Sequence, residues 1–78
     1  MTLEIISPVG TLFKGEVSLI QLPGKSGSFE ILNNHAPMIS ALKKGKIKVI
    51  DGERQTSFID IEGGTLKVER NTILILAD

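Results

Sequence analysis

The 78 residues are enough for one domain and too few for two separate cores. Nine basic and nine acidic residues cancel, and there is no Tyr or Trp, which argues against a dedicated nucleic-acid-binding protein because phosphate binding needs an excess of Lys and Arg. The absence of cysteine excludes disulfides and thiolate zinc sites and fits a reducing compartment.

The first third of the chain has the pattern of short strands. Leu3–Ser7 is an apolar run that ends at a Pro-Val-Gly break, and Thr11–Phe13 resumes it. Val17–Leu22 carries aliphatic residues on both faces, with Val17 expected on the side of Leu19, which predicts a central strand. The start of the chain lacks the pattern of a signal peptide, and no run reaches the roughly 18 apolar residues of a membrane-spanning helix.

A tight turn is predicted at Pro23–Gly27, followed by a strand at Ser28–Leu32. Side chains two residues apart share one side of a strand, so Ser28 and Glu30 are expected to face outward and Phe29 inward.

The rest of the chain continues as alternating strands divided by turn residues, and Asp51-Gly52 is its strongest hairpin signal. The remaining predicted strands are 38–42, 46–51, 54–61, 66–68 and 73–77, with further turns predicted at Lys43–Gly45, Gly63-Gly64 and Arg70-Asn71. The sequence therefore predicts a single all-β domain over residues 1–78, a flattened antiparallel β-sandwich or barrel of about 8–10 short strands.

No segment carries a convincing catalytic motif. Gly24-Lys25-Ser26 resembles the end of a phosphate-binding loop, but Leu19 stands where that motif needs glycine, and a strand follows in place of a helix. His35, the only histidine, has no nucleophile or further metal ligands at useful spacing. Nothing places Glu30 and Asp60 together as an acid pair. We therefore expect no catalytic, nucleotide or metal site and no cofactor.

Two surface features remain. The basic run Lys43–Lys48 is interpreted first as a solvated strand and second as a contact for an acidic partner. Adjacent apolar pairs require either bulged strands or an exposed apolar surface for a partner, and we favour the partner. These pairs are Ile5-Ile6, Leu12-Phe13, Met38-Ile39 and Phe58-Ile59.

The order of these segments resembles the epsilon subunit of the F-type ATP synthase. The matching features are the Pro-Gly turn and short strand up to the His-Ala-Pro loop at 35–37, the Leu-Lys-Lys-Gly turn at 42–45, and the closing segment Gly63–Asp78. The resemblance implies a non-catalytic domain in the rotating central stalk, which links the gamma subunit to the c-subunit ring and so couples proton transport to ATP synthesis. It implies a peripheral position on the cytoplasmic side of a bacterial inner membrane.

The resemblance also assigns contact residues. Ser28, Phe29 and Glu30 match the part that faces the c-subunit ring, and some relatives carry a glutamate where Ser28 stands. The positions near the gamma subunit are Ser7, His35, Met38 and Ser40. Most family members continue into a helical pair that inhibits ATP hydrolysis and in some relatives binds ATP; this sequence ends at Asp78, so neither activity is expected of it.

Two other classes fit the length and strand spacing. A biotinyl or lipoyl carrier domain presents a modified lysine on a hairpin, and the Asp51-Gly52 hairpin has none at its tip. A nucleic-acid-binding module of the OB type is disfavoured by the neutral charge and the few aromatic residues.

Overall fold

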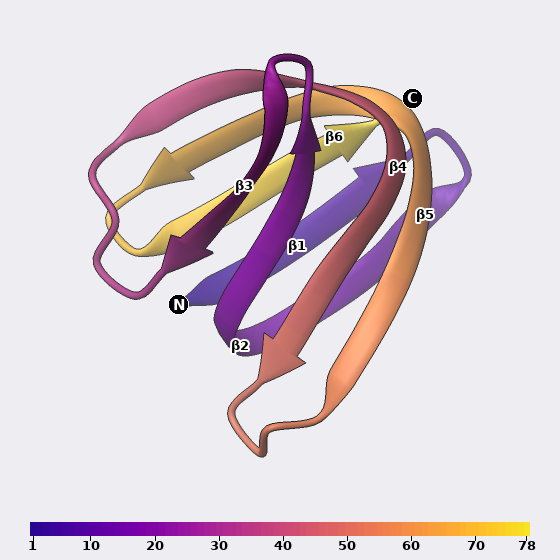
Figure 1. Ribbon diagram of the computed structural model, residues 1–78. Coiled ribbons are helices and arrows are strands. Elements are labelled where there is room, and N and C mark those ends of the chain that lie inside the picture. Colours follow the sequence, from indigo (N-terminus) through magenta and orange to yellow (C-terminus); the bar gives the residue numbers. More distant parts are fainter.

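The computed structural model describes residues 1–78 and contains six strands and no helix (Figure 1). The strands are β1 (Thr2–Ser7), β2 (Gly10–Gly24), β3 (Gly27–Leu32), β4 (Met38–Asp51), β5 (Thr56–Glu69) and β6 (Thr72–Ala77). The chain thus has no helix that could span a membrane.

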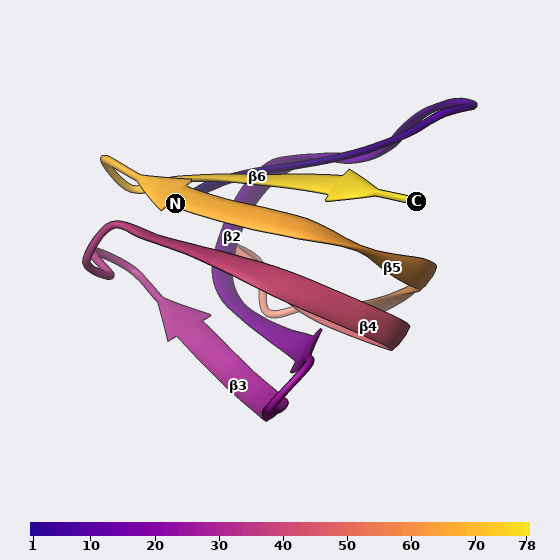
Figure 2. The same ribbon diagram turned by 90° about the horizontal axis from the view of Figure 1, so that it is seen from above.

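The strands form one sheet that closes on itself. Its order is β1-β6-β5-β4-β2-β3. A further pairing between β1 and β2 closes the sheet. Figures 1 and 2 show β2 and the long β4–β5 hairpin curving so that the sheet folds into two packed layers. The predicted all-β sandwich is confirmed. One pairing departs from the antiparallel expectation, because β1 and β6 run parallel.

The strands are longer and fewer than the sequence predicts, because several expected turns are bends inside continuous strands. Lys43–Gly45 lies within β4, and Gly63-Gly64 lies within β5. Gly64 has φ 155°, and a Cβ there would collide with the backbone of Leu76. A Cβ on Gly45 would lie 2.9 Å from the Pro23 ring. These glycines therefore let neighbouring strands approach closely where the sheet bends.

The core consists of sixteen buried apolar side chains and no buried polar ones. Two of the three register shifts that involve β2 decide which residues of its first half reach the core. Leu12 is an extra residue of β2 opposite Ile5 and Ile6, and Ser18 is extra between Val17 and Leu19. The expected sidedness of β2 was therefore wrong at its start, because the irregularity at Ser18 turns Val17 inward, away from the side of Leu19.

Two hairpins differ in how closely they follow the sequence. Arg70 and Asn71 form the predicted two-residue turn, with φ 51° and 59°. The hairpin at Asp51 is also present, but its return strand begins later than predicted, at Thr56. There Arg54 adopts positive φ, and the Asp51 carboxylate accepts the N–H groups of Glu53 and Gln55 at 2.8 and 3.0 Å.

Candidate functional site

The outer side of β1, β6 and the neighbouring halves of β5 and β4, here called the β6 face, carries apolar side chains interspersed with Glu4, Thr65 and Lys67. Its apolar members are Ile6, Ile39, Ala41, Leu74 and Leu76. The register places Ile39 beside Lys67, and Lys67 beside Leu74. The side chain of Ile39 is 74% exposed. Ile39 is the second residue of β4, where β4 pairs with β5 alone. Together with Ile6, Leu74 and Leu76 it makes this side of the sheet a candidate partner-binding surface.

A second apolar surface lies on the other layer, here called the β2 face. Its members are Leu19, Leu32, Ile50 and Phe58. Lys48 separates Phe58 from Gln21 across the sheet, and Glu30 lies on the far side of Gln21. The structure thus contains both a strand irregularity, at Leu12, and exposed apolar side chains, at Ile39 and Phe58, and the partner for this surface stays a prediction.

A recess of about 540 Å³ opens at one end of the β6 face, where β4 begins and β5 ends. It is lined by Pro37, Met38, Ile39, Lys67, Val68, Glu69 and Arg70. Met38 is half-buried against the core and Val68 is buried, so the recess has an apolar wall beside charged side chains.

Three of the four residues assigned to the gamma contact lie at this end. His35 is exposed in the loop between β3 and β4, with Nδ1 2.7 Å from the carbonyl of Ala36. Met38 and Ser40 are half-buried at the start of β4. Ser7 lies at the other end of β1, about 20 Å away along a six-residue strand, with Ile6 of the β6 face beside it. The structure does not bring Ser7 to the other three, and the β6 face lies between them.

The residues assigned to the ring contact lie on β3, the strand at the open edge of the sheet. Ser28 and Glu30 are exposed and point outward, as predicted. Phe29 is half-buried, packs against the core, and shares a recess of about 270 Å³ with Met38 and Ser40. The Lys25 N–H donates to the carbonyl of Ala41 at 3.3 Å, which ties the β2–β3 hairpin to β4.

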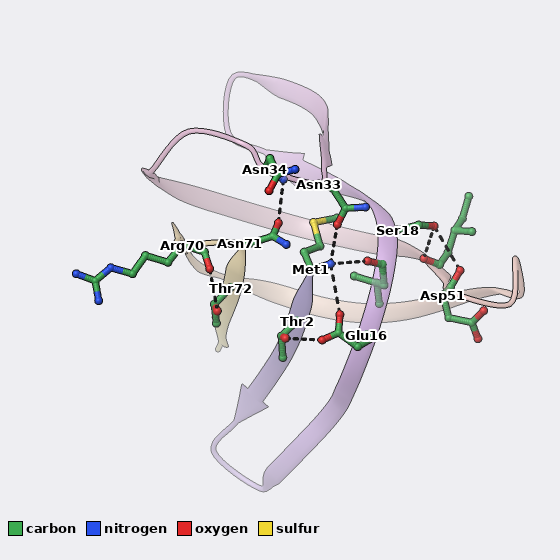
Figure 3. Close-up of polar contacts among 12 residues, drawn as sticks. Met1, Thr2, Glu16, Ser18, Asn33, Asn34, Asp51, Arg70, Asn71 and Thr72 are labelled. Atoms are coloured by element: carbon green, nitrogen blue, oxygen red, sulfur yellow. Dashed lines mark hydrogen bonds and ion pairs between the residues drawn. The ribbon is translucent and has the colours of Figure 1, made fainter.

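A polar cluster around the first residue was not anticipated from the sequence (Figure 3). The Met1 ammonium donates to the Val17 carbonyl at 3.1 Å and to Asn33 Oδ1 at 2.6 Å, and lies 3.4 Å from the Glu16 carboxylate. The Thr2 hydroxyl donates to Glu16, and this hydrogen bond and the ammonium lower the pKa of Glu16 below its usual value. These residues are far apart in the sequence and share no motif, so no sequence pattern predicts the cluster.

Two of the four lysines in the basic run pair with carboxylates across the sheet. Lys46 Nζ lies 2.9 Å from Asp60, and Lys44 Nζ lies 3.6 Å from Glu62. These exposed cross-strand pairs contribute little energy, and they favour the interpretation of a solvated strand over an acidic-partner contact. Asp60 thus pairs with Lys46 and not with Glu30. No group of three or more side chains that could bind a metal ion occurs.

Curated relatives share this sequence over nearly its whole length. The chain is 41% identical over 78 residues to the ATP synthase epsilon chain of Leptospira borgpetersenii serovar Hardjo-bovis, covering 100% of this chain and 61% of the relative. It is 41% identical over 76 residues to that of Campylobacter concisus, covering 97% and 59%. It is 42% identical over 75 residues to that of Caulobacter vibrioides, covering 96% of this chain and 86% of the relative. The chain therefore spans about 60% of the first two relatives.

Solved structures share the fold. One chain of the Euglena gracilis mitochondrial ATP synthase, OSCP/F1/c-ring, matches with a TM-score of 0.89 at 21% identity, covering 96% of this chain and 48% of its own. A chain of the Tetrahymena thermophila mitochondrial ATP synthase central stalk/c-ring matches with a TM-score of 0.82 at 19% identity, covering 99% and 62%.

The family described as the ATP synthase delta/epsilon chain, beta-sandwich domain, matches residues 1–78, the entire sequence. This match agrees with the closed two-layer sheet and with the curated relatives. The chain belongs to the ATP synthase delta/epsilon chain β-sandwich family.

Proposed function

We propose that the chain is a non-catalytic domain of the central stalk of an F-type ATP synthase, where it joins the gamma subunit to the c-subunit ring and couples proton transport to ATP synthesis. Family membership and relatives named ATP synthase epsilon chain support the proposal. The observation that carries it is the β6 face, an exposed apolar surface on a sandwich whose core is already complete.

In this proposal the gamma subunit covers the β6 face. Burial of Ile39, Leu74 and Leu76 supplies the apolar part of the contact, and His35 and Ser7 contribute polar groups at its two ends. This placement brings Ser7 and His35 into one contact although they lie at opposite ends of the β6 face, with Met38 packed against the core beneath the start of β4.

The ring contact is made by the β2–β3 hairpin. Ser28 and Glu30 present polar groups on the exposed edge strand, and the half-buried Phe29 holds that strand against the core from below. Glu30 supplies the carboxylate in place of the glutamate that some relatives carry at the position of Ser28. Phe29 shares a recess with Met38 and Ser40, but the exposed groups of the two contacts, Ser28 and Glu30 on β3 and the outer side chains of the β6 face, lie on different strands, so one rigid body can hold both partners.

The domain transmits force and performs no chemistry. Forty-two backbone hydrogen bonds lie within its strands, and the closed sheet resists the sliding that would absorb torque. It needs no cofactor. It is held at the cytoplasmic side of a bacterial inner membrane through the complex, without inserting into the lipid, and it binds no nucleic acid.

The test is complex formation with purified gamma subunit, measured by size exclusion and titration. The wild-type chain is expected to form a one-to-one complex. Ile39→Asp places a charge in the apolar contact and should weaken binding by about 100-fold or more. Phe58→Asp is the matched control, because Phe58 is 62% exposed on the opposite β2 face.

Met38→Asp should also abolish gamma binding, but Met38 packs on the core, so its folding must be verified by circular dichroism. Absence of a wild-type complex while both proteins are folded would overturn the proposed function. Equal binding by Ile39→Asp and Phe58→Asp would refute the assignment of the β6 face.

A further inference from the structure

The recess at the end of the β6 face combines an apolar wall with one unpaired positive charge. Ile39 and Met38 form the apolar side, and Lys67, Glu69 and Arg70 line the rest. Lys67 and Glu69 lie two residues apart on the outer side of β5, and their charged groups are 3.4 Å apart. They therefore neutralise one another, and the charge that remains in the recess is that of Arg70.

Arg70 has no ion-pair partner in the chain. Figure 3 shows its side chain extending away from the sheet, and the dashed line there joins its backbone carbonyl to the Thr72 hydroxyl. Its φ of 51° lies in the left-handed region, which costs energy in a residue other than glycine, asparagine or aspartate. The two-residue turn thus fixes the point from which the guanidinium projects.

We propose that this recess selects the gamma-subunit segment that docks there, a segment with an apolar side chain close to a carboxylate. The inference rests on the proposed function and extends it to the chemistry of the contact. The apolar side chain enters against Met38 and Ile39, and the carboxylate pairs with the guanidinium of Arg70. A guanidinium binds a carboxylate through two parallel N–H···O bonds, so Arg70 sets the position of the segment as well as its charge.

The experiment compares Arg70→Asn with Arg54→Asn in titrations against purified gamma subunit. Both arginines occupy hairpin connections at positive φ, 51° and 64°, and asparagine tolerates that backbone. The connection containing Arg54 lies at the far end of the β4–β5 hairpin from the β5–β6 turn (Figure 1). Arg70→Asn should weaken the complex about 10-fold, the usual effect of losing a charge-assisted pair, and Arg54→Asn should leave it unchanged.

Two further measurements identify the partner group. The affinity of the wild-type chain should fall more steeply with salt than that of Arg70→Asn. Alanine substitution of each gamma-subunit Asp and Glu should then reveal one position at which the loss disappears in the Arg70→Asn background.

The outcomes separate the two proposals. A wild-type complex that Arg70→Asn leaves intact overturns this inference and spares the proposed function, whereas failure of the wild-type chain to bind gamma overturns both. Equal losses for Arg70→Asn and Arg54→Asn would indicate general electrostatic attraction and also overturn the inference. Self-association that only Arg70→Asn abolishes would place a second copy in the recess and do the same.

Discussion

Strands β6 and β3 have the same length and opposite surroundings. β6 lies between β1 and β5, with Ile73 and Ile75 buried and Leu74 and Leu76 facing outward. β3 pairs with β2 alone. A strand held on both sides can carry an apolar outer face without its backbone being available to another chain, whereas an edge strand is safer when it is short and carries a charge, as β3 does with Glu30.

The edge position of β3 also determines which of its backbone N–H and C=O groups lack a partner strand. Pro23 has no N–H, so its pair with Ser28 lacks hydrogen bonds, and because antiparallel pairs alternate, the pairs that involve Glu30 and Leu32 lack them too. The backbone groups of these residues therefore point to the open edge. The contrast is between a fixed apolar surface and a polar edge that presents both side chains and backbone.

The largest expected effect is on the free energy of unfolding, when an inward-facing and an outward-facing residue of β6 are each replaced by alanine. Ile75 is fully buried and Leu76 is 50% exposed beside it. Ile75→Ala should lower the free energy of unfolding by about 2–5 kcal/mol because it removes buried apolar atoms and leaves a cavity. Leu76→Ala should change it by less than about 0.5 kcal/mol. Urea unfolding measures both values, and equal losses would mean that Leu76 belongs to the core.

Amide hydrogen exchange compares the two strands directly. The amides of Ser28, Glu30 and Leu32 should exchange about 100-fold faster than those of Leu74 and Ile75, because they face the open edge while β6 is paired on both sides. Exchange read by NMR gives each residue separately. Similar protection of both strands would show that another group covers the edge of β3.

Charge reversal at the edge should act on coupling and spare the fold. Glu30→Lys is expected to reduce affinity for the c-subunit ring about 5-fold and to lower proton-driven ATP synthesis in the reassembled complex, because an exposed carboxylate contact is lost. Glu53→Lys is the control, because Glu53 is exposed in the loop between β4 and β5, outside β3. Unchanged synthesis with Glu30→Lys would remove Glu30 from the ring contact.

The smallest effect concerns pH. The hydrogen bond from Thr2 and the Met1 ammonium hold the pKa of Glu16 below its usual value of 4.5 in the folded chain. The ionised form is thus favoured by folding, so its contribution is complete at neutral pH and is lost as the pH falls through 4.5 and below. Glu16→Gln should therefore lose less stability than wild type between about pH 5 and pH 3. Parallel curves would show that Glu16 contributes nothing.

The sequence predicted what depends on local pattern. Alternation gave the all-β class and the outward direction of Ser28 and Glu30, and the order of motifs gave the family. Long-range closure was not predictable from pattern. The bends at Gly45 and Gly64 exist because Pro23 and the backbone of Leu76 lie close to them, and the parallel pairing of β1 with β6 joins the two ends of the chain. The β6 face is likewise assembled from strands distant in sequence, so no local pattern could predict the recess beside Arg70.

In the proposed function two separate surfaces hold two partners at once, which can be tested by mixing the chain with gamma subunit and detergent-solubilised c-subunit ring. We predict one particle that contains all three components, in which Glu30→Lys weakens binding of the ring about 5-fold and Ile39→Asp weakens binding of gamma about 100-fold or more. Competition, in which gamma displaces the ring from the chain, would mean that both partners use the same surface and would contradict the account.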